Sequence, residues 1–220
     1  MTTTATPRPA TRTHRSRRGW WTAAGLILLS LVPMLAGAMR LTELASAGPV
    51  TADNARFFDS PVPVIAHIIS VTIYCLLGAF QFVPALRRTR WHRTAGRILI
   101  PAGLVSALSG LWMAVFYVIP GDETLLLVIR VVVGVAMVAA IVAGIASIRR
   151  RNFAAHGAWM TRAYALGVGA GTQAVVLTAW SLAVGAPDPT TNALLMGASW
   201  ALNIVVAEIA IRNPRRAGGR

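Results

Sequence analysis

The chain has 220 residues, of which 55% belong to the hydrophobic set and only 13% are charged, and its mean hydropathy is +0.61. Soluble domains contain about 45–50% apolar and about 25% charged residues, so this composition excludes an ordinary soluble domain and indicates a membrane protein. A formal net charge of +14 would suit nucleic-acid binding in a soluble chain, but here the basic residues flank apolar segments, so we expect no nucleic-acid partner.

Six apolar segments follow one another along the chain, separated by short polar stretches. They cover residues 20–39, 62–83, 98–118, 125–148, 159–180 and 193–211. Each has about 20 residues, the length at which a helix crosses about 30 Å of hydrocarbon. The sequence therefore predicts an all-α integral membrane bundle of six transmembrane helices over residues 19–212. Basic tails at 1–18 and 213–220 flank it, and we expect the first tail to lack fixed structure.

The arginines are distributed unevenly between the loops, which predicts the topology. All 21 basic residues are arginine, and 17 of them lie in the tails and in two alternate loops. These are Arg8, Arg12, Arg15, Arg17, Arg18, Arg87, Arg88, Arg90, Arg93, Arg97, Arg149, Arg150, Arg151, Arg212, Arg215, Arg216 and Arg220. By the positive-inside rule both termini are cytoplasmic, in a multi-pass protein of the bacterial inner (plasma) membrane. The expected partner of this basic face is the anionic headgroup layer of the bilayer.

The first apolar segment also has features of a cleavable signal peptide. Arg17 and Arg18 precede it, and the small residues 45–47 follow it, as in a twin-arginine signal. The segment is longer than the 7–15 residues of a typical signal core, so we favour an uncleaved first helix. Cys75 is the only cysteine, which excludes an intramolecular disulfide or a cysteine zinc site.

Four polar residues fall at one depth on different expected helices. His67, Arg130, Gln173 and Ser199 all lie six or seven residues from the outer end of their segments, or roughly 10 Å deep. Polar groups at such a depth mark a site or a packed polar pair. One interpretation is a polar chamber open to the outside, in which Arg130 meets an anionic ligand. The other is that Arg130 extends toward Glu123 while the remaining residues form ordinary interhelical hydrogen bonds.

A second cluster is expected at the cytoplasmic edge. His92 and His156 each follow an arginine cluster and an aromatic residue at the start of an outward-running helix, so equal depth is implied. Two imidazoles in one layer could be the axial ligands of a b-type haem, with Arg93, Arg97 or Arg162 pairing its propionates. Histidine beside an arginine-rich loop is also typical of an ordinary membrane interface, so both readings stay open.

Arg162 and Glu208 are expected to form a buried ion pair, because they fall at similar depth and either charge alone would be costly there. Gly167 and Gly171 form a GxxxG pattern, which favours close helix packing. No acidic metal cluster, HExxH or GxSxG motif is present, so we expect no metal site and see no support for hydrolysis.

Two motifs in the middle of the chain resemble those of a known family. They comprise Gly78, Gln81, Phe82, Arg87, His92, Arg93, Gly96 and Arg97, and then His156, Trp159, Met160, Arg162 and Tyr164. This pattern, over residues 61–180, is similar to that of an uncharacterised family of predicted bacterial membrane proteins. Leu99 stands where that pattern leads us to expect an aromatic residue. The resemblance implies no activity or cofactor, but it indicates that a role shared by the family would reside in the His92 and His156 cluster.

Three classes of function are consistent with these features. The first is a scaffold, assembly or lipid-interacting membrane protein, which we favour. The second is a haem or quinol-linked redox protein that uses His92 and His156, and the third is a small-molecule or ion-coupled transporter. The sequence does not identify a substrate, an oligomeric state or a protein partner.

Overall fold

The computed structural model describes residues 12–87, 89–117 and 124–213, and within them the chain forms eight helices and no strand. These are α1 (Arg12–Ala45), α2 (Ala55–Asp59), α3 (Pro61–Phe80), α4 (Arg90–Phe116), α5 (Thr124–Arg149), α6 (Phe153–Gly167), α7 (Gly169–Ala183) and α8 (Pro189–Arg212). In the described part of the chain, five of them are long and apolar enough to cross a membrane alone, namely α1, α3, α4, α5 and α8. This confirms the expected all-α membrane bundle.

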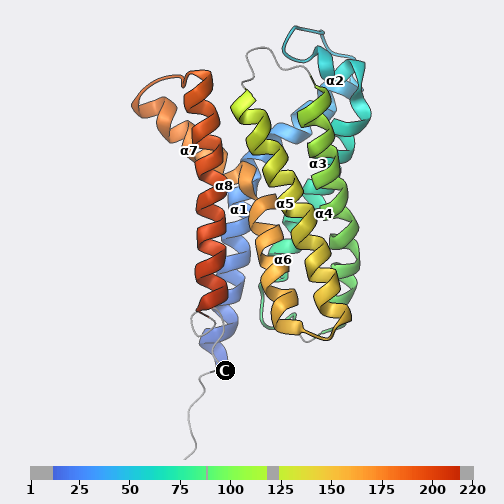
Figure 1. Ribbon diagram of the computed structural model, residues 1–220, viewed down its shortest axis with the longest axis vertical. Helices are drawn as coiled ribbons and strands as arrows, with labels where there is room; N and C mark the ends of the chain where they lie inside the picture. Colours follow the sequence, from blue (N-terminus) through green and yellow to red (C-terminus); the bar gives the residue numbers. More distant parts are fainter. Residues whose placement is uncertain (1–11, 88, 118–123, 214–220) are drawn as a thin grey trace, which may run out of the picture.

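The long helices run up and down in one bundle (Figure 1). The start of α1, the end of α8 and the α3–α4 and α5–α6 connections all lie at its lower end, so the arginine clusters meet there. We call this the arginine-rich end. The short helix α2 and the α7–α8 connection lie at the opposite end. The arrangement agrees with the expected loop pattern, while the orientation of the bundle in a membrane stays a prediction.

Helix α1 begins at Arg12, before the expected domain boundary at residue 19, so part of the first basic tail is helical. Residues 1–11 and 214–220, which make up most of the two expected tails, lie outside the described residues.

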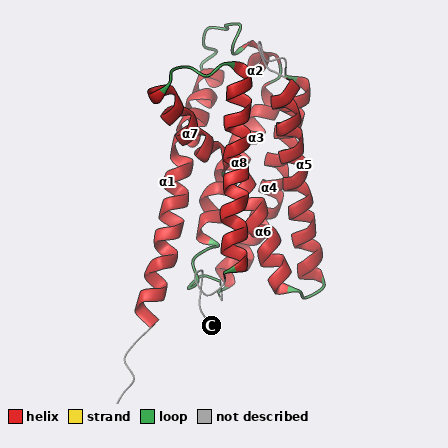
Figure 2. Ribbon diagram, turned by 60° about the vertical axis from the view of Figure 1, so that its left-hand side comes forward, coloured by secondary structure: helices red, strands yellow, loops and turns green. Residues whose placement is uncertain are grey.

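The fifth expected span, at 159–180, is not one continuous helix. It is divided between α6 and α7, whose axes differ by 42° at Val168, so the pair forms either a broken span or a re-entrant segment. Helix α7 is tilted away from the axis of α6 and packs against α1 and α8 (Figure 2). The five single helices and this pair together account for the six segments predicted from hydropathy.

A helix that ends inside a membrane protein leaves carbonyl groups that water cannot satisfy. Here other helices provide the donors. Asn203 Nδ2 donates to the carbonyl oxygen of Ala165 at 3.1 Å, and Trp200 Nε1 donates to that of Leu166 at 3.2 Å. The thiol of Cys75 lies 3.8 Å from the carbonyl oxygen of Gly167. Two residues of α8 and one of α3 therefore stabilise the break between α6 and α7.

Two tyrosine rings fill the centre of the bundle where glycines make room for them. Tyr74 is 2% exposed and Tyr164 is 5% exposed, and their ring centroids are 5.8 Å apart. A Cβ atom at Gly78 would lie 2.3 Å from the Tyr164 ring, and one at Gly103 would lie 2.7 Å from the Tyr74 ring. The hydroxyl of Tyr164 donates to the carbonyl oxygen of Cys75 at 2.8 Å, so this buried polar group is satisfied.

Candidate functional site

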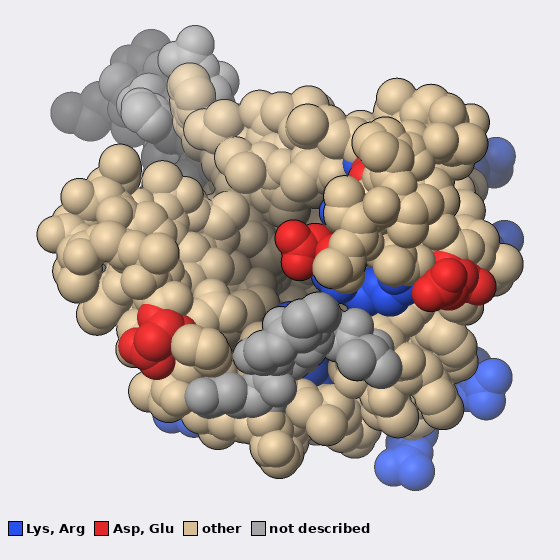
Figure 3. Space-filling model, turned by 90° about the horizontal axis from the view of Figure 1, so that it is seen from above, with Lys and Arg blue, Asp and Glu red and all other residues tan. Residues whose placement is uncertain are grey.

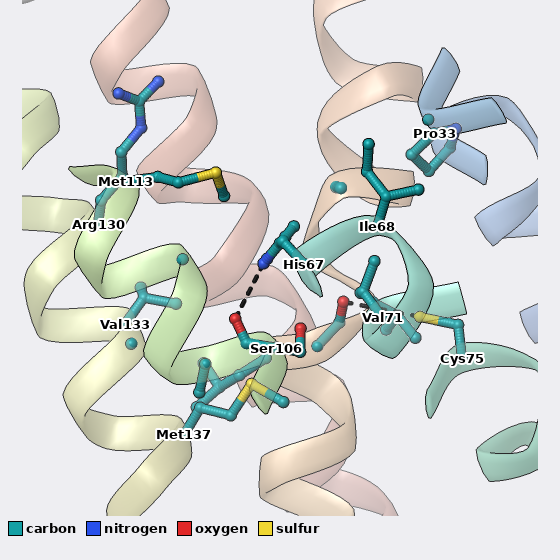
Figure 4. Close-up of a pocket in the computed structure, with 18 of the residues that line it drawn as sticks. Pro33, His67, Ile68, Val71, Cys75, Ser106, Met113, Arg130, Val133 and Met137 are labelled. Carbon is teal, nitrogen blue, oxygen red and sulfur yellow. Dashed lines mark hydrogen bonds between the residues drawn. The ribbon is translucent and has the colours of Figure 1, made fainter. Parts of the chain in front are cut away.

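A cavity of about 500 Å³ lies between the helices, above the break at Val168 and toward the end opposite the arginine clusters. Its wall is mainly apolar and is contributed by α1, α3, α4, α5, α7 and α8 together with α2 and the break itself. The polar and charged side chains that line it include those of Ser30, Arg56, His67, Thr72, Ser106, Tyr117, Arg130 and Gln173. Figure 4 shows several lining residues from separate helices around the cavity.

The outer margin of the cavity is set by the connection between α1 and α3. Asn54 is 5% exposed; its Nδ2 donates to Glu43 at 2.5 Å and to the carbonyl oxygen of Pro49 at 3.0 Å. Its Oδ1 accepts from the backbone N–H of Thr51 at 2.6 Å. This network holds the connection in one conformation, which places the following residues of α2 over the cavity.

Arg56 and Phe57 are the residues of α2 that line the cavity. The guanidinium carbon of Arg56 lies 4.5 Å from the centroid of the Phe57 ring, and that of Arg40 lies 4.4 Å from it. Burial lowers the pKa of Arg56, the charge of Arg40 lowers it further, and Asp53 opposes the shift. The guanidinium stays protonated at neutral pH because its ordinary pKa is so high.

Tyr117 connects the end of α4 to this margin. Its hydroxyl donates to the carbonyl oxygen of Ser60 at 2.6 Å, and its ring packs edge-on against Phe57 with centroids 5.4 Å apart. Burial raises the pKa of this phenol, so it is neutral at physiological pH. Seen from above, this end of the molecule is hollowed between the helices, with acidic and basic side chains beside the hollow (Figure 3).

His67 lies deeper in the wall, and its hydrogen bonds define its tautomer. Nδ1 is 2.9 Å from the carbonyl oxygen of Ser106 (Figure 4). It is also 3.2 Å from the hydroxyl of Ser109. A carbonyl oxygen can only accept, so Nδ1 carries the proton and Nε2 of the neutral ring is an acceptor. This lining residue can therefore accept a hydrogen bond from a hydroxyl or amide group.

The structure brings together three of the four polar residues expected in the outer layer. His67, Arg130 and Gln173 line the cavity, and Nε2 of Gln173 donates to the carbonyl oxygen of Met196 at 3.4 Å. Ser199 is 1% exposed and bonds within its own helix to the carbonyl oxygen of Leu195 at 2.8 Å, so it is a packing residue. Glu123, the alternative partner expected for Arg130, lies outside the described residues.

Sequence reasoning missed the cavity residues of α2, because they lie between two expected spans and have no depth that can be counted from a helix end. It also missed Tyr117, which lies at the end of the third expected segment and not at the depth of the four polar residues. It also missed the break at Val168. A signal for the break was present in the three glycines at 167, 169 and 171, of which Gly167 and Gly171 were interpreted only as a GxxxG packing pattern.

The two histidines of the expected inner cluster both lie at the arginine-rich end. Nδ1 of His156 is 2.9 Å from the carbonyl oxygen of Gly144, an ordinary contact between α6 and α5. Nδ1 of His92 is buried and has no hydrogen-bond partner. Neither histidine lines the 500 Å³ cavity. A haem shared by the two rings stays a prediction.

The arginines expected to bind an anion with these histidines have different environments. Arg162 Nε donates to Glu208 at 2.6 Å and its Nη2 donates at 3.2 Å, so this expected pair is bidentate. The two side chains are 28% and 25% exposed, so the pair lies at the surface of the bundle rather than buried within it. Arg93 and Arg97 are exposed on α4. Among the described residues, no group of three or more potential metal ligands occurs.

A family comparison identifies the relatives of this bundle. The family model described as "Predicted membrane protein (DUF2306)" matches residues 64–211, from α3 through α8. The chain belongs to this family. Its description records a membrane location and no activity, in agreement with the resemblance seen in the two motifs. No curated protein and no solved structure matches the chain.

Proposed function

We propose that this member of the family is a lipid-interacting membrane protein that holds one amphipathic anionic molecule in the 500 Å³ cavity. A single observation carries the proposal: a mainly apolar cavity within the bundle has two arginines, Arg56 and Arg130, among its lining residues. Its volume is in the range of about 300–1,000 Å³ that is typical of small-molecule sites.

The arrangement of the wall suggests how such a molecule would be oriented. Arg56 belongs to α2 at the outer margin, and Arg130 is the seventh residue of α5, counted from the end of that helix at Thr124. Most of the other lining side chains, including those of Val71, Met137 and Leu166, are apolar. A carboxylate or phosphate would sit near the guanidinium groups, and an acyl or ring system would contact the apolar wall, where removal of apolar area from water is favourable.

Binding of a fluorescent fatty acid tests this function in the purified protein. The probe is cis-parinaric acid, and its uncharged methyl ester is the matched ligand. We expect the acid to bind more tightly than the ester, and the double variant Arg56→Gln with Arg130→Gln to remove this preference. Equal affinity of the wild-type protein for acid and ester would contradict the electrostatic part of the proposal.

A cavity-filling variant tests the location of the site. Ala114 lines the cavity, whereas Ala139 on α5 is exposed on the bundle surface. Ala114→Phe should weaken probe binding at least about tenfold, because the new ring occupies the volume that the probe needs. Ala139→Phe adds the same group outside the cavity and should leave binding within about twofold. Similar losses in both variants would place the probe elsewhere.

A carrier would also have to release the molecule at the arginine-rich end. Probe flux into vesicles that contain the protein distinguishes this alternative, because a protein that only binds lipid saturates without transferring the probe.

A further inference from the structure

The ring of His67 is anchored to α4 along one edge. Its Nδ1 lies 2.9 Å from the carbonyl oxygen of Ser106. A Cβ atom added at Gly110 would lie 3.5 Å from Nδ1 and 3.3 Å from Cε1, whereas Nε2 would be more than 4 Å from it. The glycine therefore leaves room for the edge formed by Nδ1 and Cε1 against α4, and Nε2 takes no part in this contact.

Nε2 of His67 is an acceptor that is open to the cavity. Among the described residues, no group donates a hydrogen bond to it. The side-chain atoms of the described chain that are both unpartnered and closed off from solvent are Nε2 of Gln81 and Nδ1 of His92, so Nε2 of His67 is not closed off. Because His67 lines the 500 Å³ cavity, a molecule in the cavity can reach this nitrogen.

Gln173 contributes a second open acceptor, from α7. This residue is 6% exposed and lines the cavity. Its Nε2 donates to the carbonyl oxygen of Met196 at 3.4 Å, which leaves Oε1 as an acceptor without a donor among the residues that the structure describes. Helices α3 and α7 thus each bring an uncharged acceptor, without its donor, to a wall that is mainly apolar.

The charged group of an anionic ligand does not suit these acceptors. Ionised carboxylate and phosphate oxygens only accept hydrogen bonds, so they have no proton to offer to Nε2 of the neutral imidazole. The groups suited to them are Arg56 and Arg130. Burial lowers the pKa of Arg56, and the charges of Arg40 and Arg130 lower it further, so the two cavity arginines are close enough to act on each other. The atoms of the ligand near His67 must therefore provide a separate, uncharged donor.

We infer that the amphipathic anion carries a hydroxyl group on its apolar part and donates it to Nε2 of His67, so that the ligand class is a hydroxylated lipid acid. The inference rests on the proposed function, in which Arg56 and Arg130 hold the charge. A hydroxyl group needs one acceptor, whereas an amide also brings a carbonyl oxygen that must find a donor in a mainly apolar wall. His67 is then the residue that distinguishes hydroxylated from plain lipid acids.

Displacement of cis-parinaric acid from the purified protein measures this preference. The competitors are stearic acid and three hydroxystearic acids, with the hydroxyl on carbon three, ten or twelve, which share its charge and chain length. The measured ratio is the affinity of each hydroxy acid divided by that of stearic acid, which needs no acceptor. In the wild-type protein, at least one hydroxy acid should bind within about threefold of stearic acid or more tightly, since the hydrogen bond to His67 offsets the lost hydration of the hydroxyl group.

Substitutions at His67 should change this ratio while stearic acid still binds. His67→Phe keeps a ring but removes the acceptor, so the ratio for the best-bound hydroxy acid should fall about tenfold. His67→Gln keeps an amide oxygen that can accept, and it should hold the ratio within about threefold of the wild-type value. Ser109→Ala is the matched control, because the Ser109 hydroxyl is 3.2 Å from Nδ1 and Ser109 does not line the cavity. It should change the ratio less than about twofold.

The inference is overturned if every hydroxy acid binds to the wild-type protein about tenfold or more weakly than stearic acid, or if His67→Phe and Ser109→Ala change the ratio alike. Parinaric acid would still bind in preference to its methyl ester in both cases, so the proposed function would stand. Equal binding of acid and ester instead removes the proposed function and this inference with it. Thermal unfolding of each variant separates loss of the acceptor from loss of the fold. If His67→Phe does not fold, the smaller His67→Leu provides the same comparison.

Discussion

Gly171 provides a sensitive test of the packing that surrounds the broken span. Pro33 lacks an N–H group, so the carbonyl oxygen of Leu29, four residues earlier in α1, has no helical partner. Gly171 of α7 packs against this carbonyl. A Cβ atom at position 171 would lie 2.3 Å from the Leu29 oxygen and 2.9 Å from its carbonyl carbon. Both are backbone atoms of a helix, so neither can rotate away, and α1 and α7 would have to separate.

The expected magnitude of Gly171→Ala follows from two opposing effects. Overpacking of a tight contact costs about 1–3 kcal/mol. Replacing a helical glycine with alanine contributes about 0.5–1 kcal/mol of stability through reduced chain entropy. The net result should be a loss of about 1–2 kcal/mol in the free energy of unfolding. Gly25→Ala, on α1, is the matched control because no atom lies within 4 Å of its added Cβ, so it should be neutral or stabilising.

Unfolding of both variants in mixed micelles with increasing sodium dodecyl sulfate measures the difference. Gly171 also lines the cavity, so Gly171→Ala should weaken parinaric acid binding while Gly25→Ala leaves it unchanged. If Gly171→Ala were as stable as Gly25→Ala, the close contact between α1 and α7 would be refuted.

Two further predictions concern the ion pair and the topology. In a double-mutant cycle, Arg162→Ala and Glu208→Ala should each lower stability more than half as much as the double variant. Glu208→Ala leaves Arg162 without this carboxylate, and Arg162→Ala leaves Glu208 with only the exposed Arg212 at 3.7 Å; simple additivity would argue against coupling. A periplasm-active reporter fused after Arg93 should be inactive, because the α3–α4 connection carries one of the arginine clusters; an active reporter would invert the topology.

The polar residues show how far depth counting along separate helices can go. Counting from the outer ends placed His67, Arg130 and Gln173 in one layer, and they do line one cavity. The same counting included Ser199, which does not line the cavity. Its hydroxyl donates to the carbonyl oxygen of Leu195 within α8. Depth is one coordinate of a helix residue, and the direction of its side chain around the helix is another. The second coordinate depends on which helices are neighbours, and neither hydropathy nor charge specifies that.

The sequence by itself determined the membrane class, the apolar segments and the meeting of the arginine clusters at one end. These are properties of consecutive residues, because a run of about 20 apolar side chains needs lipid wherever its neighbours lie. The division of the fifth segment at Val168 was decided by the tertiary structure, because the glycines around it permit a break but do not require one. A helix can stop at that depth only if its last carbonyls find donors, and Asn203 and Trp200 provide them from α8. The cavity depends on the same break, because Val168 and residues of α7 such as Ala170 and Gly171 form part of its wall.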